Sequence, residues 1–241
     1  MRFKLPPNRL VIVIIFATYV LYLGFNSQLK FYIHPRYVVF TFSMAAIGLL
    51  LALMDGYFDS KSSVKKHNHS KQSKIIHLPM YFIIAVALFI PARSLTSATI
   101  SQRAADTGSI ISTSESKPLT SLFSGSSKGL SISDWSRIID DNKDSAYYAN
   151  KPVKISGFVY DGNLGDNVML LARFVVTCCA VDAVPVTVPV EIANWQSEYE
   201  QDEWLEVEGY FEEIITSKGE ALVLVPSSVI KIEQPSNPYA N

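Results

Sequence analysis

Sulfur and imidazole side chains are scarce in this sequence. It has 2 cysteines and 4 histidines among 241 residues, and no histidine follows His77. The region beyond His77 therefore offers no imidazole to serve as a general base or as a zinc ligand. It also has no serine in a strand-to-helix nucleophile elbow and no phosphate-binding glycine loop. We therefore expect the protein not to be an enzyme.

A large net charge is also lacking, since the formal value is −1. Two regions of opposite charge cancel: basic residues are in excess by about ten before residue 131, and acidic residues are in excess by about eleven after it. Binding of nucleic acid needs a basic groove with stacking aromatic side chains. The acidic C-terminal region does not fit that description, and we expect no nucleic-acid partner.

Long apolar runs are confined to the first hundred residues. Three of them, at residues 10–25, 37–54 and 78–95, approach the roughly 20 residues that a helix needs to cross a bilayer. The first follows a basic start, as a signal peptide does, but the residues after it (NSQLK) contain no small-residue cleavage site. We predict a membrane region over residues 1–95 with three helices in contact with lipid.

The lysines and arginines of the short loops predict an orientation. Basic residues crowd the N-terminus and the second loop, whereas the first loop has only Lys30 and Arg36. The protein is thus expected in the cell or plasma membrane with its N-terminus in the cytoplasm. The chain after residue 95 is expected outside the cytoplasm, in a compartment where a disulfide can persist. The second loop also contains His67 and His69, which are weak metal candidates because a flexible loop keeps them solvated.

The next segment, residues 96–131, is rich in serine and threonine (SLTSATISQ, SIISTSESK, SLFSGSSKG). Such a composition buries too little apolar surface to offset the entropy of ordering, so we predict a flexible spacer. The final domain, residues 132–241, is expected to begin with one short helix. Ser133 is its predicted N-cap, and Trp135 and Ile138 follow at helical spacing.

Five runs of alternating apolar and polar residues then predict strands. Their sequences are KISGFVY, VMLLARFVVT, VPVTVPVEI, LEVEGYFEE and ALVLV. Turn residues such as Asp161-Gly162-Asn163 separate them. Gly157 and Gly209 lie inside strands, where a small barrel has to bend. We predict a mostly-β, OB-like barrel of five strands, with an open sandwich as the alternative.

The two cysteines are adjacent, and Asp182 follows them closely in the sequence TCCAVD. Side chains of neighbouring residues on a strand point to opposite faces, so Cys178 and Cys179 can hold one ion only if the strand bulges or turns. With Asp182 they offer part of a site for zinc, copper or another transition metal. Two alternatives remain open: structural packing of one thiol, and thiol redox chemistry. Arg173 lies on the same predicted strand face as Cys179, where it would lower a thiol pKa, hold Asp182 or pair with another carboxylate.

The segments KISGFVY, ARFVVTCCAVDAVPV, DEWLEVEGYFEE and IKIEQPSNPY resemble the YcgQ-like family of two-component permease subunits. The three apolar runs and the spacer share the resemblance. It implies a membrane-anchored protein with a C-terminal domain of unknown function beside a separate polytopic permease. The residues that match the family's motif are Gly157, Phe158, Arg173, Cys178, Cys179, Asp182 and Pro185. Related chains often carry a histidine-rich loop, whereas the corresponding loop of this chain has few histidines.

From these observations we expect an accessory or regulatory subunit of a permease. Its extracytoplasmic β domain would dock on the transporter through residues of the motif, and Cys178, Cys179 and Asp182 would handle a metal. The alternative is a stand-alone extracytoplasmic protein that uses Cys178 and Cys179 for metal binding or thiol redox chemistry.

Overall fold

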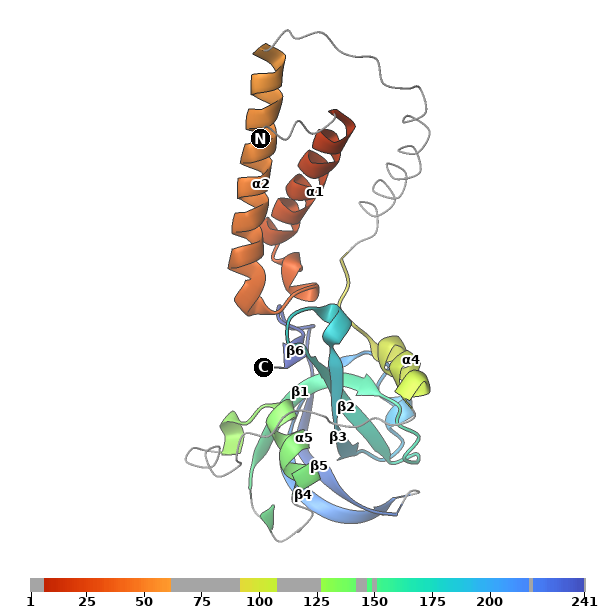
Figure 1. Ribbon diagram of the computed structural model, residues 1–241. Coiled ribbons are helices and arrows are strands. Elements are labelled where there is room, and N and C mark those ends of the chain that lie inside the picture. Colours follow the sequence, from red (N-terminus) through yellow and green to blue (C-terminus); the bar gives the residue numbers. More distant parts are fainter. Residues whose placement is uncertain are drawn as a thin grey trace. The chain divides into compact units, whose positions relative to one another are not determined.

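The computed structural model describes residues 7–61, 92–107, 127–141, 147–148, 151–216 and 219–240. The chain divides into two compact units, residues 1–93 and 94–241. We call them the helical unit and the β unit, and each is described by itself (Figure 1).

The described residues of the helical unit form two long helices, α1 (Pro7–Phe25) and α2 (Pro35–Lys61), with the 3-10 helix η1 (Gln28–Phe31) between them. The two helices pack against each other. The rings of Phe25 and Phe42 meet edge to face with centroids 5.1 Å apart. A Cβ atom at Gly24 would lie 2.6 Å from the Phe42 ring, so glycine at this position permits the close approach.

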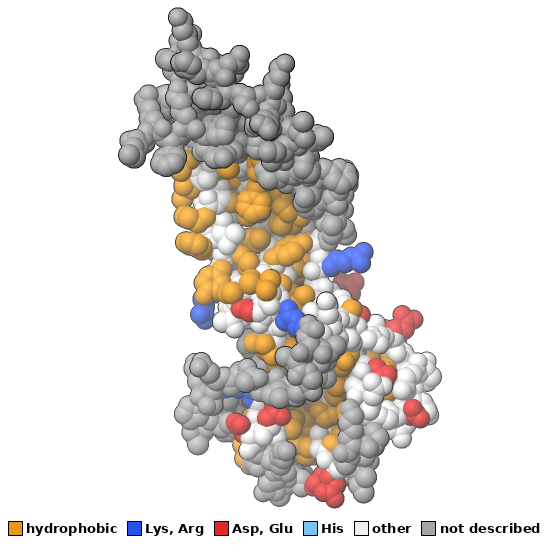
Figure 2. Space-filling view, turned by 45° about the vertical axis from the view of Figure 1, so that its right-hand side comes forward, with side chains coloured by type: hydrophobic (Ala, Val, Ile, Leu, Met, Phe, Trp, Pro, Cys, Tyr) orange, Lys and Arg blue, Asp and Glu red, His pale blue; other side chains and the backbone are white. Residues whose placement is uncertain are grey.

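Among the described helices, one is long and apolar enough to cross a membrane, the segment Pro35–Met54 of α2. The apolar part of α1, Val11–Phe25, is shorter. The prediction of three such helices is therefore not met by the described residues. The third predicted run lies mostly outside them, and its last residues, 92–95, are not helical. Hydrophobic side chains cover the visible surface of the helical pair (Figure 2).

Within the described part of the β unit the chain forms six strands, and antiparallel pairing dominates. Their bounds are β1 (Val153–Tyr160), β2 (Val168–Val175), β3 (Val184–Glu191), β4 (Trp204–Thr216), β5 (Gly219–Lys231) and β6 (Tyr239–Ala240). The order in the sheet is β1-β4-β5-β3-β2-β6, and β1 also pairs with β2. The first five strands therefore form a continuous ring of neighbours, in which only β3 and β5 run parallel.

The predicted alternation of side chains is visible in β1 and β2, which are covered on both faces. Val159 and Leu171 belong to a cluster that includes residues of helix α5, the α5-side cluster. Phe158 and Ala172, one position along, belong to a second cluster that includes Ile100 of helix α4, the α4-side cluster. Successive residues of a strand point to opposite faces, so the two strands separate these clusters.

Helix α5 (Ile132–Asp141) fulfils the prediction of a short helix at the start of the final domain. Its N-cap differs from the prediction: the Ser131 hydroxyl accepts a hydrogen bond from the Asp134 N–H, and the Asp134 carboxylate accepts one from the Ser131 N–H. This reciprocal pair is a capping box. Ser133, the predicted cap, lies inside the helix and is buried. Trp135 packs against Phe211 in the α5-side cluster.

Helix α4 (Ser97–Thr107) lies within the stretch that the composition predicts to be a flexible spacer. The carboxylate of Asp202, which is distant in the sequence, accepts two hydrogen bonds from the first residue of α4. The N–H of Ser97 donates to Oδ1 at 2.7 Å, and the Ser97 hydroxyl donates to Oδ2 at 2.9 Å. Ile100, one turn further, is completely buried. These contacts hold α4 against the strands (Figure 1). The spacer prediction fails at residues 97–107 because composition alone does not register contacts with a distant part of the chain.

The two strand glycines lie where backbones approach closely. A Cβ atom at Gly157 would lie 2.6 Å from the carbonyl oxygen of Ala172 on β2, and one at Gly209 would collide with the carbonyl oxygen of Val225 on β5. The register between β4 and β5 also shifts between Glu208 and Gly209. Both glycines therefore permit neighbouring backbones to approach closely, and at Gly209 the strand pairing is also irregular.

Candidate metal site

The cysteines lie in the connection between β2 and β3, which we call the cysteine loop (residues 176–183). Strand β2 ends at Val175, the chain bends at Thr177 and Cys178, and the 3-10 helix η5 (Ala180–Asp182) completes the loop. The predicted strand VMLLARFVVT is thus shorter than expected. Because the chain turns here, the two thiols are freed from the alternation of an extended strand.

The turn brings the thiols together. Cys178 Sγ lies 3.6 Å from Cys179 Sγ. One ligand atom from each of Cys178, Cys179 and Asp182 lies within 4.8 Å of the others. Cys178 is exposed and Cys179 is half-buried, so the structure does not bury either thiol as the packing alternative requires. The predicted cluster is therefore a compact group that solvent and a partner can reach.

Asp182 organises the loop through the backbone. Its carboxylate accepts hydrogen bonds from three consecutive N–H groups, those of Thr177 at 3.2 Å, Cys178 at 2.7 Å and Cys179 at 3.3 Å. The backbone N–H of Asp182 in turn donates to the carbonyl of Cys179. A short carboxylate side chain commonly stabilises a turn in this way. Asp182 is thus a positioning residue for both cysteines as well as a candidate ligand.

The carboxylate and the thiols also change each other's proton affinity. The pKa of the Cys178 thiol is raised to about 11, mainly by its hydrogen bond to Asp182 and to a smaller extent by its hydrogen bond to Cys179. Loss of the thiol proton would leave two negative charges side by side. Partial burial would raise the pKa of Asp182, but hydrogen bonds from the Cys178 thiol and from the three N–H groups lower it overall. A metal at this site has to displace a proton from Cys178.

The spacing of the ligand atoms fits a transition metal. A tetrahedral zinc ion about 2.3 Å from each sulfur sets two sulfur ligands roughly 3.8 Å apart. The observed separation is 3.6 Å, whereas a disulfide requires about 2.05 Å. Two sulfurs and one oxygen leave a fourth position for water or a partner, since every histidine of the chain lies before residue 78. The donor set suits a borderline or soft metal ion.

Arg103 contacts this site, although no sequence motif predicts it. Its Nη2 donates to the carbonyl oxygens of Ala180 at 3.1 Å and Val181 at 3.2 Å. These two residues separate Cys179 from Asp182. The serine-rich composition masks the helix that presents Arg103, although the run ISQRAAD contains good helix formers that would have signalled it.

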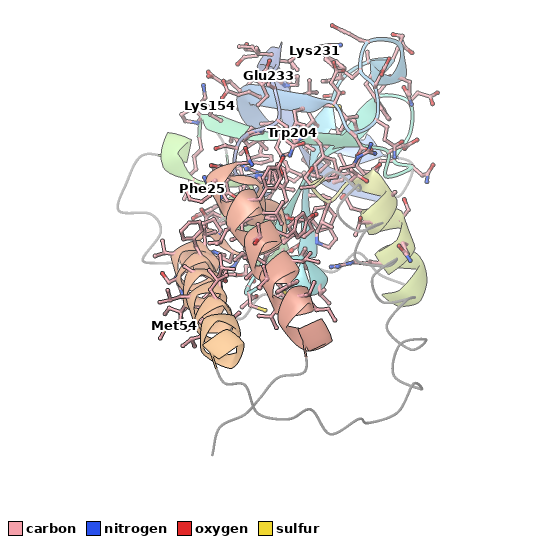
Figure 3. The ribbon with its side chains drawn as sticks, turned by 90° about the horizontal axis from the view of Figure 1, so that it is seen from above. Phe25, Met54, Lys154, Trp204, Lys231 and Glu233 are labelled. Atoms are coloured by element: carbon pink, nitrogen blue, oxygen red, sulfur yellow. The ribbon has the colours of Figure 1, made fainter. Side chains whose placement is uncertain are left out.

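Arg173 is half-buried and does something other than predicted. Its guanidinium donates to the carbonyl oxygens of Asn237, Pro238 and Tyr239. It also lies over the Trp204 ring, 5.5 Å from the centroid; Figure 3 shows Trp204 among the side chains of the β unit. Burial lowers the pKa of Arg173. This arginine fastens the C-terminal segment beside β2, where β6 pairs with it.

The other residues of the predicted motif have less exposed positions than a docking surface needs. Gly157 and Phe158 are buried in β1, where the Phe158 ring stacks on Phe174 and meets Trp204 at its edge. Pro185 is half-buried opposite Phe174 at the start of β3. These contacts favour a packing role. His67 and His69 lie outside the described residues.

Comparison with known families gives matches over both units of the chain. Residues 8–106 match the DUF1980 N-terminal domain. Residues 131–241, which contain the six strands and the cysteine loop, match the DUF1980 C-terminal domain. A search among curated proteins found no match. Because the two domains together account for most of its length, this chain belongs to the DUF1980 family, whose activity is uncharacterised.

Proposed function

We propose that this protein is a membrane-anchored accessory subunit of a permease, and that its β unit binds a thiophilic metal ion through Cys178, Cys179 and Asp182. The observation that carries the metal proposal is the spacing of the ligand atoms, with the sulfurs 3.6 Å apart and all three ligand atoms within 4.8 Å. The partner in this proposal is a polytopic permease, as in the YcgQ-like family that the sequence resembles.

Exposure of the site fits a hand-over of metal more than permanent storage. Structural zinc sites are closed by four protein ligands, whereas this group supplies three, and Cys178 is exposed. An open position lets a donor or an acceptor add its own ligand while the ion is still held. In this proposal the β unit lies outside the cytoplasm and passes the ion to or from the permease.

The proposed scaffold is an OB-like barrel. Its support is the ring of neighbours β1-β2-β3-β5-β4, which returns to β1, together with the parallel pairing of β3 and β5. The proposed anchor rests on the apolar segment Pro35–Met54. In such a protein the helices hold the β unit beside the transporter.

Metal analysis of the full-length protein in detergent tests the metal proposal. We expect about one zinc ion per chain after dialysis against zinc, and loss of that ion in the variant Cys178→Ser/Cys179→Ser. Asp166→Asn is the control, because Asp166 is an exposed carboxylate outside the loop. Wild-type protein that retains no more zinc than the double variant would contradict the proposal.

Gentle extraction from the native membrane tests the partner. A polytopic membrane protein that co-purifies in stoichiometric amount would support the accessory-subunit proposal. Recovery of the chain alone, with bound metal or with its cysteines oxidised, would favour the stand-alone metal or thiol-redox protein instead.

A further inference from the structure

Helix α4 is hydrogen-bonded to the middle of the cysteine loop and shares an apolar cluster with the two ends of the loop. Val176 and Ala183, the first and last residues of the loop, are buried in the α4-side cluster together with Ile100. Between them, Arg103 Nη2 binds the carbonyl oxygens of Ala180 and Val181. The same helix therefore bonds to the centre of the loop, and its Ile100 belongs to the apolar cluster in which both ends of the loop are buried.

The position of α4 is itself fixed far from the loop. Asp202 lies in the turn before β4, and its carboxylate binds the N–H and the hydroxyl of Ser97. A carboxylate at a helix N-terminus satisfies free N–H groups and interacts favourably with the helix dipole. Arg103 follows six residues later, about 9 Å along the helix axis. The bonds at Ser97 thus fix the start of the helix that presents Arg103.

We infer that Arg103 is a positioning residue of the metal site, and that docking of α4 on the β unit determines how tightly Cys178, Cys179 and Asp182 hold an ion. This inference rests on the proposed function. The Arg103 guanidinium fixes the two carbonyls between Cys179 and Asp182, so the ligand atoms keep the spacing that a metal needs. With α4 undocked, the loop loses this restraint and the ligand atoms separate.

The chain connects this device to the helical unit. Residues 92–96 lead directly into α4, so any event that pulls on this connection acts first on the helix that restrains the loop. A site built in this way holds its ion while α4 is docked and releases it when α4 is displaced. That behaviour is what delivery to a membrane partner requires.

The test compares Arg103→Gln with Arg103→Lys in full-length protein in detergent. Removing a residue that orients metal ligands typically weakens affinity 10- to 100-fold. We expect a loss of about tenfold or more in zinc affinity for Arg103→Gln, measured by competition with a chromogenic chelator, and a partial recovery for Arg103→Lys. The control is Arg36→Gln, which removes the same charge from an exposed residue outside α4 and the connection that leads into it.

A remote variant separates positioning from direct contact. Ser97→Ala removes one of the two bonds to Asp202 but leaves Arg103 intact. We expect zinc affinity to fall in the same direction, by a smaller factor, and urea unfolding followed by tryptophan fluorescence to show that the β unit of the variant is still folded under the conditions of the binding assay. Wild-type affinity in both Arg103→Gln and Ser97→Ala would overturn the inference.

A measurement on metal-free protein tests the role of Arg103 separately from the proposed metal binding. Thiol labelling of metal-free protein should be several-fold faster in Arg103→Gln than in wild type and Arg36→Gln, because the loop opens. If wild-type protein binds no zinc, the proposed function fails, and faster labelling still supports the role of Arg103 in holding the loop. Equal labelling rates in all three proteins would contradict that role.

Discussion

The helical unit and the β unit are made of similar apolar residues but dispose of them in opposite ways. In the helical unit, Phe40 and Leu50 of α2 are 63% and 59% exposed. In the β unit, Trp135 and Leu171 are completely buried. Apolar surface that the chain does not cover needs other apolar surroundings, which a bilayer supplies. The comparison teaches that hydrophobicity alone does not define a core; the arrangement of strands and helices decides what is buried.

Acidic side chains, tryptophans and cysteines are also unevenly divided between the two units. Figure 2 shows acidic side chains distributed over the β unit. All three tryptophans and both cysteines also lie there, at positions 135, 195, 204, 178 and 179. Tryptophan fluorescence and thiol labelling of the full-length protein therefore report on the β unit alone. One measurement can thus compare how variants in either unit affect the β unit.

The largest effect is expected from truncation of a buried ring. Trp135→Ala removes a side chain with no exposed surface, and substitutions of this kind cost about 3–5 kcal/mol. Phe40→Ala on the exposed face of α2 should change the unfolding free energy of the β unit by less than about 0.5 kcal/mol. Urea unfolding followed by fluorescence of the remaining tryptophans measures both. Equal effects would break the comparison between the two regions.

A charge in the apolar helix is expected to act on insertion instead. Leu50→Arg lies within the segment Pro35–Met54, where an arginine costs about 3 kcal/mol relative to an apolar residue in a membrane-spanning helix. The fraction of protein recovered in the membrane pellet should fall. Glu212→Arg, on an exposed position of β4, should leave that fraction unchanged. Full membrane recovery of Leu50→Arg would argue against α2 as the anchor.

A pair of glycines gives a smaller, opposite pair of effects. Gly157→Ala would force a Cβ atom to within 2.6 Å of a backbone carbonyl, and we expect a destabilisation of about 1–3 kcal/mol. Gly48→Ala on α2 meets nothing within 4 Å and should stabilise its helix by up to about 1 kcal/mol. Thermal unfolding followed by circular dichroism and fluorescence separates the two. Destabilisation by both would show that α2 is more closely packed than described.

The smallest expected effect concerns one thiol and leaves the fold intact. The thiolate is the form that reacts with iodoacetamide. Since the pKa of Cys178 is raised from an ordinary 9.0 to about 11, its labelling rate should keep increasing with pH until about pH 11. Asp182→Asn removes the neighbouring charge and should move the midpoint down. A Cys179→Ser background isolates the signal of Cys178 and removes the smaller contribution of Cys179, so the midpoint there should lie above 9.0 and below about 11. A midpoint near 9.0 in this background with Asp182 intact would contradict the interaction with Asp182.

Prediction from the sequence succeeds where the signal is local and periodic. The alternating runs identify β1, β2 and β3 nearly to the residue, and Trp135 and Ile138 mark the face of α5 that is buried. It fails where a distant residue decides the structure: α4 depends on Asp202, 105 positions beyond Ser97. Arg173 shows the same limit, because its partners are three carbonyls of the C-terminal segment.

The sequence by itself determined the separation into an apolar N-terminal region and an acidic β-rich region, the strand periodicity and the candidate ligands Cys178, Cys179 and Asp182. These features depend on composition and on contacts between near neighbours. Only the tertiary structure decided that the two thiols lie on the same side of a turn, that α4 and Arg103 restrain that turn, and that Arg173 holds the C-terminal segment. The contacts of α4 and of Arg173 join residues 64 to 105 positions apart, and they depend on how strands and helices pack, which no local pattern in the sequence encodes.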